Sequence, residues 1–210
     1  MGVVKRIKCG FVNCFLIKEN DNAILIDTGI TKYKDKVLDI CKNENVRLIV
    51  LTHGHIDHIQ NTAYLAKKLN VPIAMNEDDY ELTKDNFIEH MYAHSLLGKF
   101  ILLMSLRSFK RDKAEEFKPD IFLKDGDSLE KFEVNAKVVS LKGHTRGSIG
   151  INAFGTDFII GDALMNMFYP TKSMLYGNRK DVDNSACKIS NLGNITIHFG
   201  HGKSVKNRKW

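Results

Sequence analysis

Three histidines and one aspartate stand close together in residues 52–58, which read Thr-His-Gly-His-Ile-Asp-His. Imidazole and carboxylate groups are ligands that suit zinc, iron and similar ions. Alternation along an extended segment would place His53, His55 and Asp57 on one side, and His58 on the other side or on a following helix. The segment therefore predicts two adjacent metal positions. A solvated histidine-rich loop or a purification artefact is the alternative, which its internal position disfavours.

Three later residues of ligand type each stand beside glycine, directly after a strand-like run. They are His144, which follows Gly143, Asp162, which follows Gly161, and His201, which lies between two glycines. Glycine permits a sharp turn and a close approach of the backbone to a ligand. Any one of them alone would be typical of a turn residue or a cap. Their repetition predicts that they complete the metal site begun by residues 52–58.

The elements that must position these residues follow from the apolar pattern. In the first half, strands are predicted at residues 3–7, 11–17, 23–27, 47–51 and 71–75, and helices at 33–42 and 60–69. In the second half, strands are predicted at 136–141, 149–154, 158–160 and 195–199, and a helix at about 182–192. This alternation predicts an α/β or α+β protein with layered strands and helices outside.

Residues 86–118 interrupt that pattern. Positions 96–106 are strongly apolar but fall short of the ~20 residues that span a bilayer. We expect an amphipathic helical pair packed on the body, with a substrate lid, a dimer surface or a membrane-surface contact as alternatives. His90 and His94 are expected on a helix of this segment, in a substrate contact or partly buried rather than in an extra metal site.

Composition sets broader limits. The 210 residues, 43% hydrophobic and 27% charged, with three prolines and no linker-like tract, predict one domain. The start, Met-Gly-Val-Val-Lys-Arg, has no features of a secretion signal, so a cytoplasmic location is expected. Cys9, Cys14, Cys41 and Cys187 lack metal or redox spacing and are expected as free, buried thiols. The net charge of +6 and the basic tail give no reason to expect a nucleic-acid partner.

The set His53-x-His55-x-Asp57-His58, His144, Asp162 and His201 resembles the metallo-β-lactamase superfamily. The resemblance extends from the turn Asp27-Thr28-Gly29 to His201, nearly the whole chain. It implies a four-layer αβ/βα sandwich over residues 1–210, with residues 86–118 as a helical insertion. It also implies two metal ions at an edge between two sheets.

Carried over residue by residue, the resemblance implies that His53, His55 and His144 bind one metal. Asp57, His58 and His201 would bind the second, and Asp162 would bridge them. The ions would be divalent, Zn²⁺ above all, with Mn²⁺ or iron as alternatives. The implied reaction is hydrolysis by a hydroxide shared between the metals, with Asp57 or Asp162 orienting its proton. Asp27 would orient the ligand loop, or else be a plain turn residue.

Departures from individual subfamilies narrow the expected substrate. The common β-lactamases carry a cysteine where Asp162 stands, glyoxalase II-like thioesterases add a C-terminal extension, and lactonases place a tyrosine where this chain has Met165. A hydrolase acting on an ester, thioester or lactone of a small substrate fits best, and residues 96–106 suggest an acyl-bearing one. A single-iron persulfide dioxygenase, a phosphodiesterase and a non-catalytic scaffold are the alternatives.

Partners are less constrained by the sequence. Arg146 and Lys172 are candidates to meet an anionic group of a small-molecule substrate, or are solvated turn charges. A homodimer through residues 86–118 is a further hypothesis.

Overall fold

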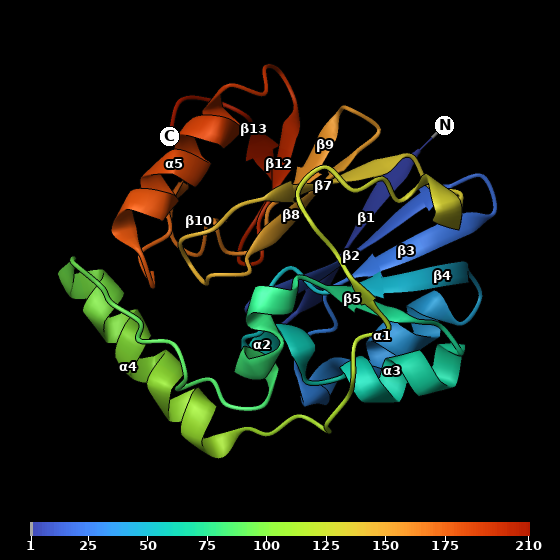
Figure 1. The fold of residues 1–210 in the computed structure, drawn as a ribbon, viewed down its shortest axis with the longest axis horizontal. Coiled ribbons are helices and arrows are strands. Elements are labelled where there is room, and N and C mark those ends of the chain that lie inside the picture. The colour runs from blue at the N-terminus through green and yellow to red at the C-terminus, as the bar shows by residue number, and fades with distance from the viewer. Residues whose placement is uncertain (1) are drawn as a thin grey trace.

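The computed structural model describes residues 2–210 and contains two facing β-sheets with helices on their outer sides (Figure 1). The larger sheet has six strands in chain order, antiparallel from β1 to β3 and parallel from β3 to β6. Its strands are β1 (Val3–Cys9), β2 (Val12–Glu19), β3 (Asn22–Ile26), β4 (Asn45–Val50), β5 (Ile73–Met75) and β6 (Ile121–Phe122).

The smaller sheet has five strands in the order β13-β12-β9-β8-β7. Within it β9 and β12 are parallel, and the other neighbours are antiparallel. The strands are β7 (Ala136–Ser140), β8 (Ile149–Ala153), β9 (Asp157–Ile159), β12 (Thr196–His198) and β13 (Val205–Lys206). A separate hairpin joins β10 (Leu164–Met165) and β11 (Thr171–Lys172).

Alternating side chains of the central strands supply three apolar layers. Leu16 of β2 points to the layer shared with α1 (Lys34–Cys41) and α3 (Thr62–Leu69). Its neighbours Phe15 and Ile17 point to the layer between the two sheets. On the far side, α5 (Arg179–Ser190) packs Ala186 and Ile189 against the smaller sheet. These layers confirm the predicted αβ/βα sandwich. Buried on both faces, the strands read as apolar runs.

The helix predicted at residues 60–69 is present as α3, and a short helix that was not predicted precedes it. This single helical turn, α2 (Ile56–Ile59), begins directly after His55. Asp57 and His58 therefore lie on a helical turn, and the predicted strand-like alternation is wrong for Asp57. The turn still places both side chains beside the later ligand-type residues.

The segment 86–118 contains one helix, α4 (Leu96–Arg111), so the predicted helical pair is wrong. Ser95 starts α4, because its side chain accepts a hydrogen bond from the amide of Gly98. His90 and His94 precede the helix and are exposed, so their predicted helical placement is also wrong. Figure 1 shows α4 at the edge of the molecule, apart from α1 and α3. No helix within residues 2–210 is long and apolar enough to cross a membrane.

Short elements complete the chain. Cys9, Cys14 and Cys41 are buried as predicted, but Cys187 is exposed on α5, which corrects its predicted burial. Residues 2–210 also contain four 3₁₀ turns, η1 (Thr31–Tyr33), η2 (Glu77–Asp79), η3 (Glu81–Thr83) and η4 (Glu130–Phe132).

Candidate metal centre

The seven ligand-type residues come from segments that end at one edge of the sandwich. The parallel pairing of β9 with β12 sets Ile159 beside His198, so Asp162 and His201 leave the smaller sheet at the same edge. The parallel pairing of β3 with β4 likewise sets Ile26 beside Val50, which brings Asp27 next to Thr52. The loop and α2 after β4, and the turn after β7, contribute the remaining residues. They are His53, His55, Asp57, His58 and His144.

Three imidazoles form a first group. Potential ligand atoms of His53, His55 and His144 lie within 4.8 Å of one another, and all three residues are buried. Nδ1 of His53 lies 3.0 Å from the Thr52 hydroxyl, and Nδ1 of His144 lies 2.9 Å from the carbonyl oxygen of Leu175. Those contacts leave Nε2 of both rings for the centre. His55 differs, because it turns Nδ1 toward Nε2 of His144 at 3.0 Å.

Asp57, His58 and His201 form a second group with the same spacing. Nδ1 of His201 lies 2.8 Å from the carbonyl oxygen of Phe11, so Nε2 faces Asp57 Oδ2 at 3.5 Å. Asp162 lies between the groups. Its carboxylate oxygens are 3.2 Å from His201 Nε2, 3.5 Å from His58 Nε2 and 3.7 Å from His144 Nε2.

Three buried polar atoms at this place have no hydrogen-bond partner in the described chain: Nε2 of His53, Nε2 of His58 and Oδ1 of Asp162. An unsatisfied buried polar group costs about 1–3 kcal/mol, so three together would be a substantial penalty. Cations would satisfy them, and this donor set of imidazoles and carboxylates suits Zn²⁺ or iron. The residues present therefore fit the metals that the sequence predicts.

The two groups differ in their affinity for protons. Burial lowers the pKa of His53 and His55 well below 6.5, and it also lowers the pKa of His144. Burial opposes protonation of His58 too, but Asp57, Asp162 and Asp27 outweigh it and raise its pKa to about 10. In the first group the imidazoles are consequently ready to bind a cation without first losing a proton.

Asp27 contacts His58 of the second group on the side of the ring that faces away from the centre. Its Oδ1 accepts the amide hydrogen of Thr52, and its Oδ2 lies 2.8 Å from both the Thr52 hydroxyl and Nδ1 of His58. Its backbone has a left-handed φ of 58°, a conformation that aspartate and asparagine adopt more readily than most residues. Of the two roles considered for Asp27, these contacts favour the orienting one.

Asp79 supports the first group and was not predicted from the sequence. It is fully buried at the end of η2. Its carboxylate accepts hydrogen bonds from the amides of Gly54 and Gly147, at 2.9 and 2.5 Å, and from the Thr145 hydroxyl at 2.7 Å. It thus joins the loop of His53 and His55 to the loop of His144. A Cβ on Gly54 would lie 2.8 Å, and a Cβ on Gly147 2.6 Å, from an oxygen of Asp79. In the sequence, these two glycines are the feature that indicates a close neighbour beside the ligand loops.

Asn86 makes a similar tie at the start of the insertion. Its side-chain oxygen accepts the amide hydrogen of Ile56 at 2.7 Å, and its amide group donates to the carbonyl of Gly54 at 3.0 Å. The insertion is thereby fastened to the ligand loop itself.

Arg146 and Lys172, the two candidates for an anionic group of the substrate, lie in ion pairs. Nε of Arg146 is 2.8 Å from Glu89, and Nζ of Lys172 is 2.7 Å from Asp183. Neither residue lines the cavity over the metal centre. The structure therefore does not support their predicted contact with a substrate there.

A cavity of about 320 Å³ opens directly onto the centre. Five of the seven ligand-type residues form its floor: His55, Asp57, His144, Asp162 and His201. Two of these imidazoles lie against aromatic rings, His201 stacked on Phe11 at 5.9 Å and His55 on Phe109 at 5.1 Å between ring centroids. The floor is thus polar, and the nearest walls are apolar.

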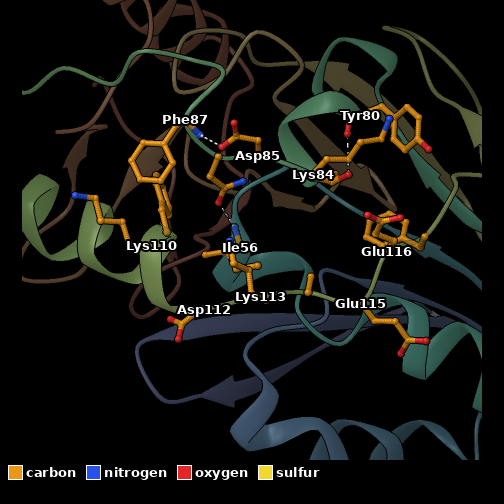
Figure 2. A pocket seen from close by; sticks show the side chains of 15 residues that line it. Ile56, Tyr80, Lys84, Asp85, Phe87, Lys110, Asp112, Lys113, Glu115 and Glu116 are labelled. Carbon is orange, nitrogen blue, oxygen red and sulfur yellow. Dashed lines mark hydrogen bonds between the residues drawn. The ribbon is translucent and has the colours of Figure 1, made fainter.

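A second hollow lies beneath the C-terminal end of α4, and Figure 2 shows Lys84, Asp85, Lys110 and Asp112 around it. Charges of both signs line it, and none of the seven ligand-type residues does. Within residues 2–210, the candidate metal-binding groups all lie at the first cavity.

Comparison with known proteins agrees with this geometry. A sequence profile of the metallo-beta-lactamase superfamily matches residues 7–168. An uncharacterized protein of Aquifex aeolicus is 30% identical over 149 residues, which cover 69% of this chain and 62% of that protein. Hydroxyacylglutathione hydrolase GloC of Haemophilus influenzae is 29% identical over 146 residues, 66% of this chain and 59% of that protein.

Solved structures of low identity share the fold. The crystal structure of BLEG-1 B3 metallo-beta-lactamase aligns with a TM-score of 0.74 and 19% identity, and that of TTHA1623 in a di-iron-bound form with 0.69 and 21%. Each alignment covers 97% of this chain and 94% of the other. The profile match spans more than half of the chain, and the chain belongs to the metallo-beta-lactamase superfamily.

Proposed function

We propose that this protein is a hydrolase that uses two divalent metal ions to cleave an ester, thioester or lactone bond in a small, acyl-bearing substrate. The observation that carries the proposal is the meeting of two ligand groups on either side of Asp162, at the floor of an apolar cavity. Superfamily membership and the similarity to a hydroxyacylglutathione hydrolase support hydrolysis.

His53, His55 and His144 would hold one ion, and Asp57, His58 and His201 would hold the other. Asp162, within 3.7 Å of imidazoles from both groups, would contact both ions. When bound, such ions lower the pKa of a coordinated water to about 7 and polarise a carbonyl group. Zn²⁺ suits the donor set, and iron or Mn²⁺ are the alternatives.

The chain's own side chains would then position substrate and protons. Asp57 is the least buried of the ligand-type residues and lines the cavity, so its carboxylate is placed to orient a proton of the attacking water. Asp162 is the second candidate for that role. Phe11 and Phe109 would exclude bulk water from the imidazoles against which they stack, which strengthens electrostatic interactions there.

The proposal treats the chain as a single domain. Residues 1–210 would act as one catalytic domain, with residues 86–118 as an insertion that closes one side of the cavity. The cytoplasmic location, the lack of a nucleic-acid partner and a homodimer through residues 86–118 stay predictions from the sequence.

The test combines metal content with a substrate panel. Protein made without an affinity tag is loaded with Zn²⁺, Mn²⁺ or Fe²⁺, its metal is counted, and it is assayed on thioesters, esters, lactones, phosphodiesters and β-lactams. We expect two ions per chain and turnover of acyl substrates, both lost in Asp162→Ala. One iron per chain with sulfite formed from a persulfide, or turnover of phosphodiesters alone, would refute the proposal.

A further inference from the structure

We propose that the cavity-facing side of α4 binds the acyl chain of the substrate, so that the enzyme prefers unbranched acyl groups of medium length over short ones. This inference rests on the proposed function, because it assigns a substrate class to the same site. Exposed apolar side chains surround the polar floor of the cavity.

Four large apolar side chains line the cavity and are at the same time open to solvent. On α4, Phe100 is 60% exposed and Met104 is 49% exposed. Outside α4, Phe11 is 54% exposed and Phe168 is 62% exposed. An exposed apolar patch of this kind marks a binding surface, and this one converges on the candidate metal ligands.

The interior of the same cavity is also apolar. Met91, Met165 and Met167 line it together with Leu175 and Ile101. Methionine side chains are flexible and polarisable, so they adapt to chains of different shape. A wall rich in methionine therefore suits an unbranched hydrocarbon chain better than a rigid ring system of fixed outline.

Polar groups of α4 also line the cavity, mostly toward the C-terminal half of the helix. They are Ser105, Arg107, Ser108 and Arg111, and Nη1 of Arg107 lies 3.8 Å from Sδ of Met104. Phe100, one turn before Met104, extends the apolar side toward the N-terminal end. The cavity's carboxylates, Asp57 and Asp162, belong to the floor. A bound ester or thioester would place its carbonyl over the floor and its acyl chain along Phe100 and Met104.

Continuity with the metal centre favours an acyl chain over a second protein copy as the occupant. The lining of one cavity includes both the α4 side chains and the ligand-type residues His55, His144 and His201. A protein partner seated on Phe100 and Met104 would close the route to the centre.

The register of α4 supplies a matched pair for the test. Met104 and Leu103 are neighbours on the helix with nearly equal exposure, 49% and 48%. Met104 lines the cavity, and Leu103 does not. Glutamate at either position adds the same charge to the same helix, so the two variants compare a carboxylate in the cavity with one outside it.

The first measurement is binding, not turnover. N-acetyl-S-octylcysteamine, a thioether that cannot be hydrolysed, and its S-ethyl analogue are titrated calorimetrically into metal-loaded protein. Each buried methylene contributes about 0.8 kcal/mol, which corresponds to about fourfold in affinity. We expect the octyl compound to bind at least tenfold more tightly than the ethyl one. Met104→Glu should remove most of that preference, and Leu103→Glu should keep it.

The second measurement is kcat/KM on thioesters from acetyl to octanoyl. We expect a rise with chain length that Met104→Glu flattens and Leu103→Glu preserves; Phe100→Gln serves as a second cavity variant. Turnover without chain-length dependence, or equal losses in Met104→Glu and Leu103→Glu, would overturn the acyl-chain assignment and leave hydrolysis standing. Octyl binding that depends on Met104 but no hydrolysis of any acyl substrate would instead overturn the proposed function.

Discussion

Asp27 and His58 form a buried contact of 2.8 Å between a carboxylate oxygen and Nδ1, which fixes the imidazole with Nε2 toward the candidate metal centre. Such a carboxylate behind a ligating histidine sets the ring orientation and raises its basicity. Because the same carboxylate accepts the amide hydrogen of Thr52, it also fixes the start of the ligand loop.

Replacing Asp27 by asparagine should lower the affinity of the second metal position. Asparagine tolerates the left-handed backbone at this residue, so the fold should be retained while the charged partner of His58 is lost. We expect affinity to fall by about 10–100-fold, measured by competition with a chelator. Asp183→Asn, a surface carboxylate paired with Lys172, is the control. Unchanged metal affinity in Asp27→Asn would contradict the orienting role.

Asp79→Asn should weaken the first metal position selectively. In asparagine one of the two oxygens is replaced by an amide group that only donates, so either the hydrogen bond from Gly147 or those from Gly54 and Thr145 would be lost. The connection between the loops of His53 and His144 would be weakened, and we expect at least about a tenfold loss of affinity. Metal titration should show one ion per chain bound with lower affinity and one bound with unchanged affinity. An equal loss at both positions would indicate general destabilisation instead.

Metal binding at the two positions should differ in its dependence on pH. Burial lowers the pKa of His53, His55 and His144, so above neutral pH those rings have no proton to lose. His58, with its pKa raised to about 10 by three carboxylates, must release a proton to bind a cation. The pKa of His201 at the same position is raised as well, because Asp162 and Asp57 outweigh the effect of burial. Between pH 7 and 9 affinity should therefore rise by about tenfold per pH unit at the second position and stay nearly level at the first.

Calorimetry in two buffers of different ionisation enthalpy checks this. One of the two binding events should release a proton to the buffer, and the other should not. Proton release of equal size in both events would show that the carboxylates do not hold a proton on His58.

Gly200→Ala should disrupt the centre without changing any ligand. A Cβ at this position would lie 2.8 Å from Cε1 of His58 and would also meet Oδ1 of Asp162. We expect loss of at least one ion and of activity, measured by metal content and turnover, with the far-ultraviolet circular dichroism spectrum retained. Gly177→Ala is the matched control, since its Cβ would meet nothing closer than 3.6 Å. Full metal content in Gly200→Ala would show that the backbone around residue 200 can move to accommodate a methyl group without disturbing His58 and Asp162.

Layered strands with helices outside could be predicted from the sequence, because buried strands appear as apolar runs. The seven ligand-type residues could be grouped into one hypothesis, because imidazole and carboxylate groups are recognisable as metal ligands from residue type alone. The predicted site lacked Asp79 and Asn86. Both act through contacts with Gly54, which lies 25 or more positions away in the chain, and no local pattern encodes such a contact.

Errors of local structure have local causes. The start of α4 is set by the side chain of Ser95, so His90 and His94 stay outside a helix that the apolar pattern alone would have extended. Asp57 was assigned to an extended segment because the helical turn of α2, only four residues long, is too short to show a helical period. Cys187 stands on α5, whose buried side carries Val182, Ala186 and Ile189, and the helical period turns Cys187 to the solvent.

Two of the hydrogen bonds that orient the ligands come from the walls of the cavity. The carbonyl groups of Phe11 and Leu175 accept from Nδ1 of His201 and Nδ1 of His144, and both residues line the space above the centre. A ligand that moves the backbone of Phe11 or Leu175 would therefore also shift the imidazole that is hydrogen-bonded to it. A substitution at Phe11 or Leu175 that shifts its carbonyl group would also move the imidazole that it orients, so the shape of the cavity and the positions of the candidate metal ligands are coupled.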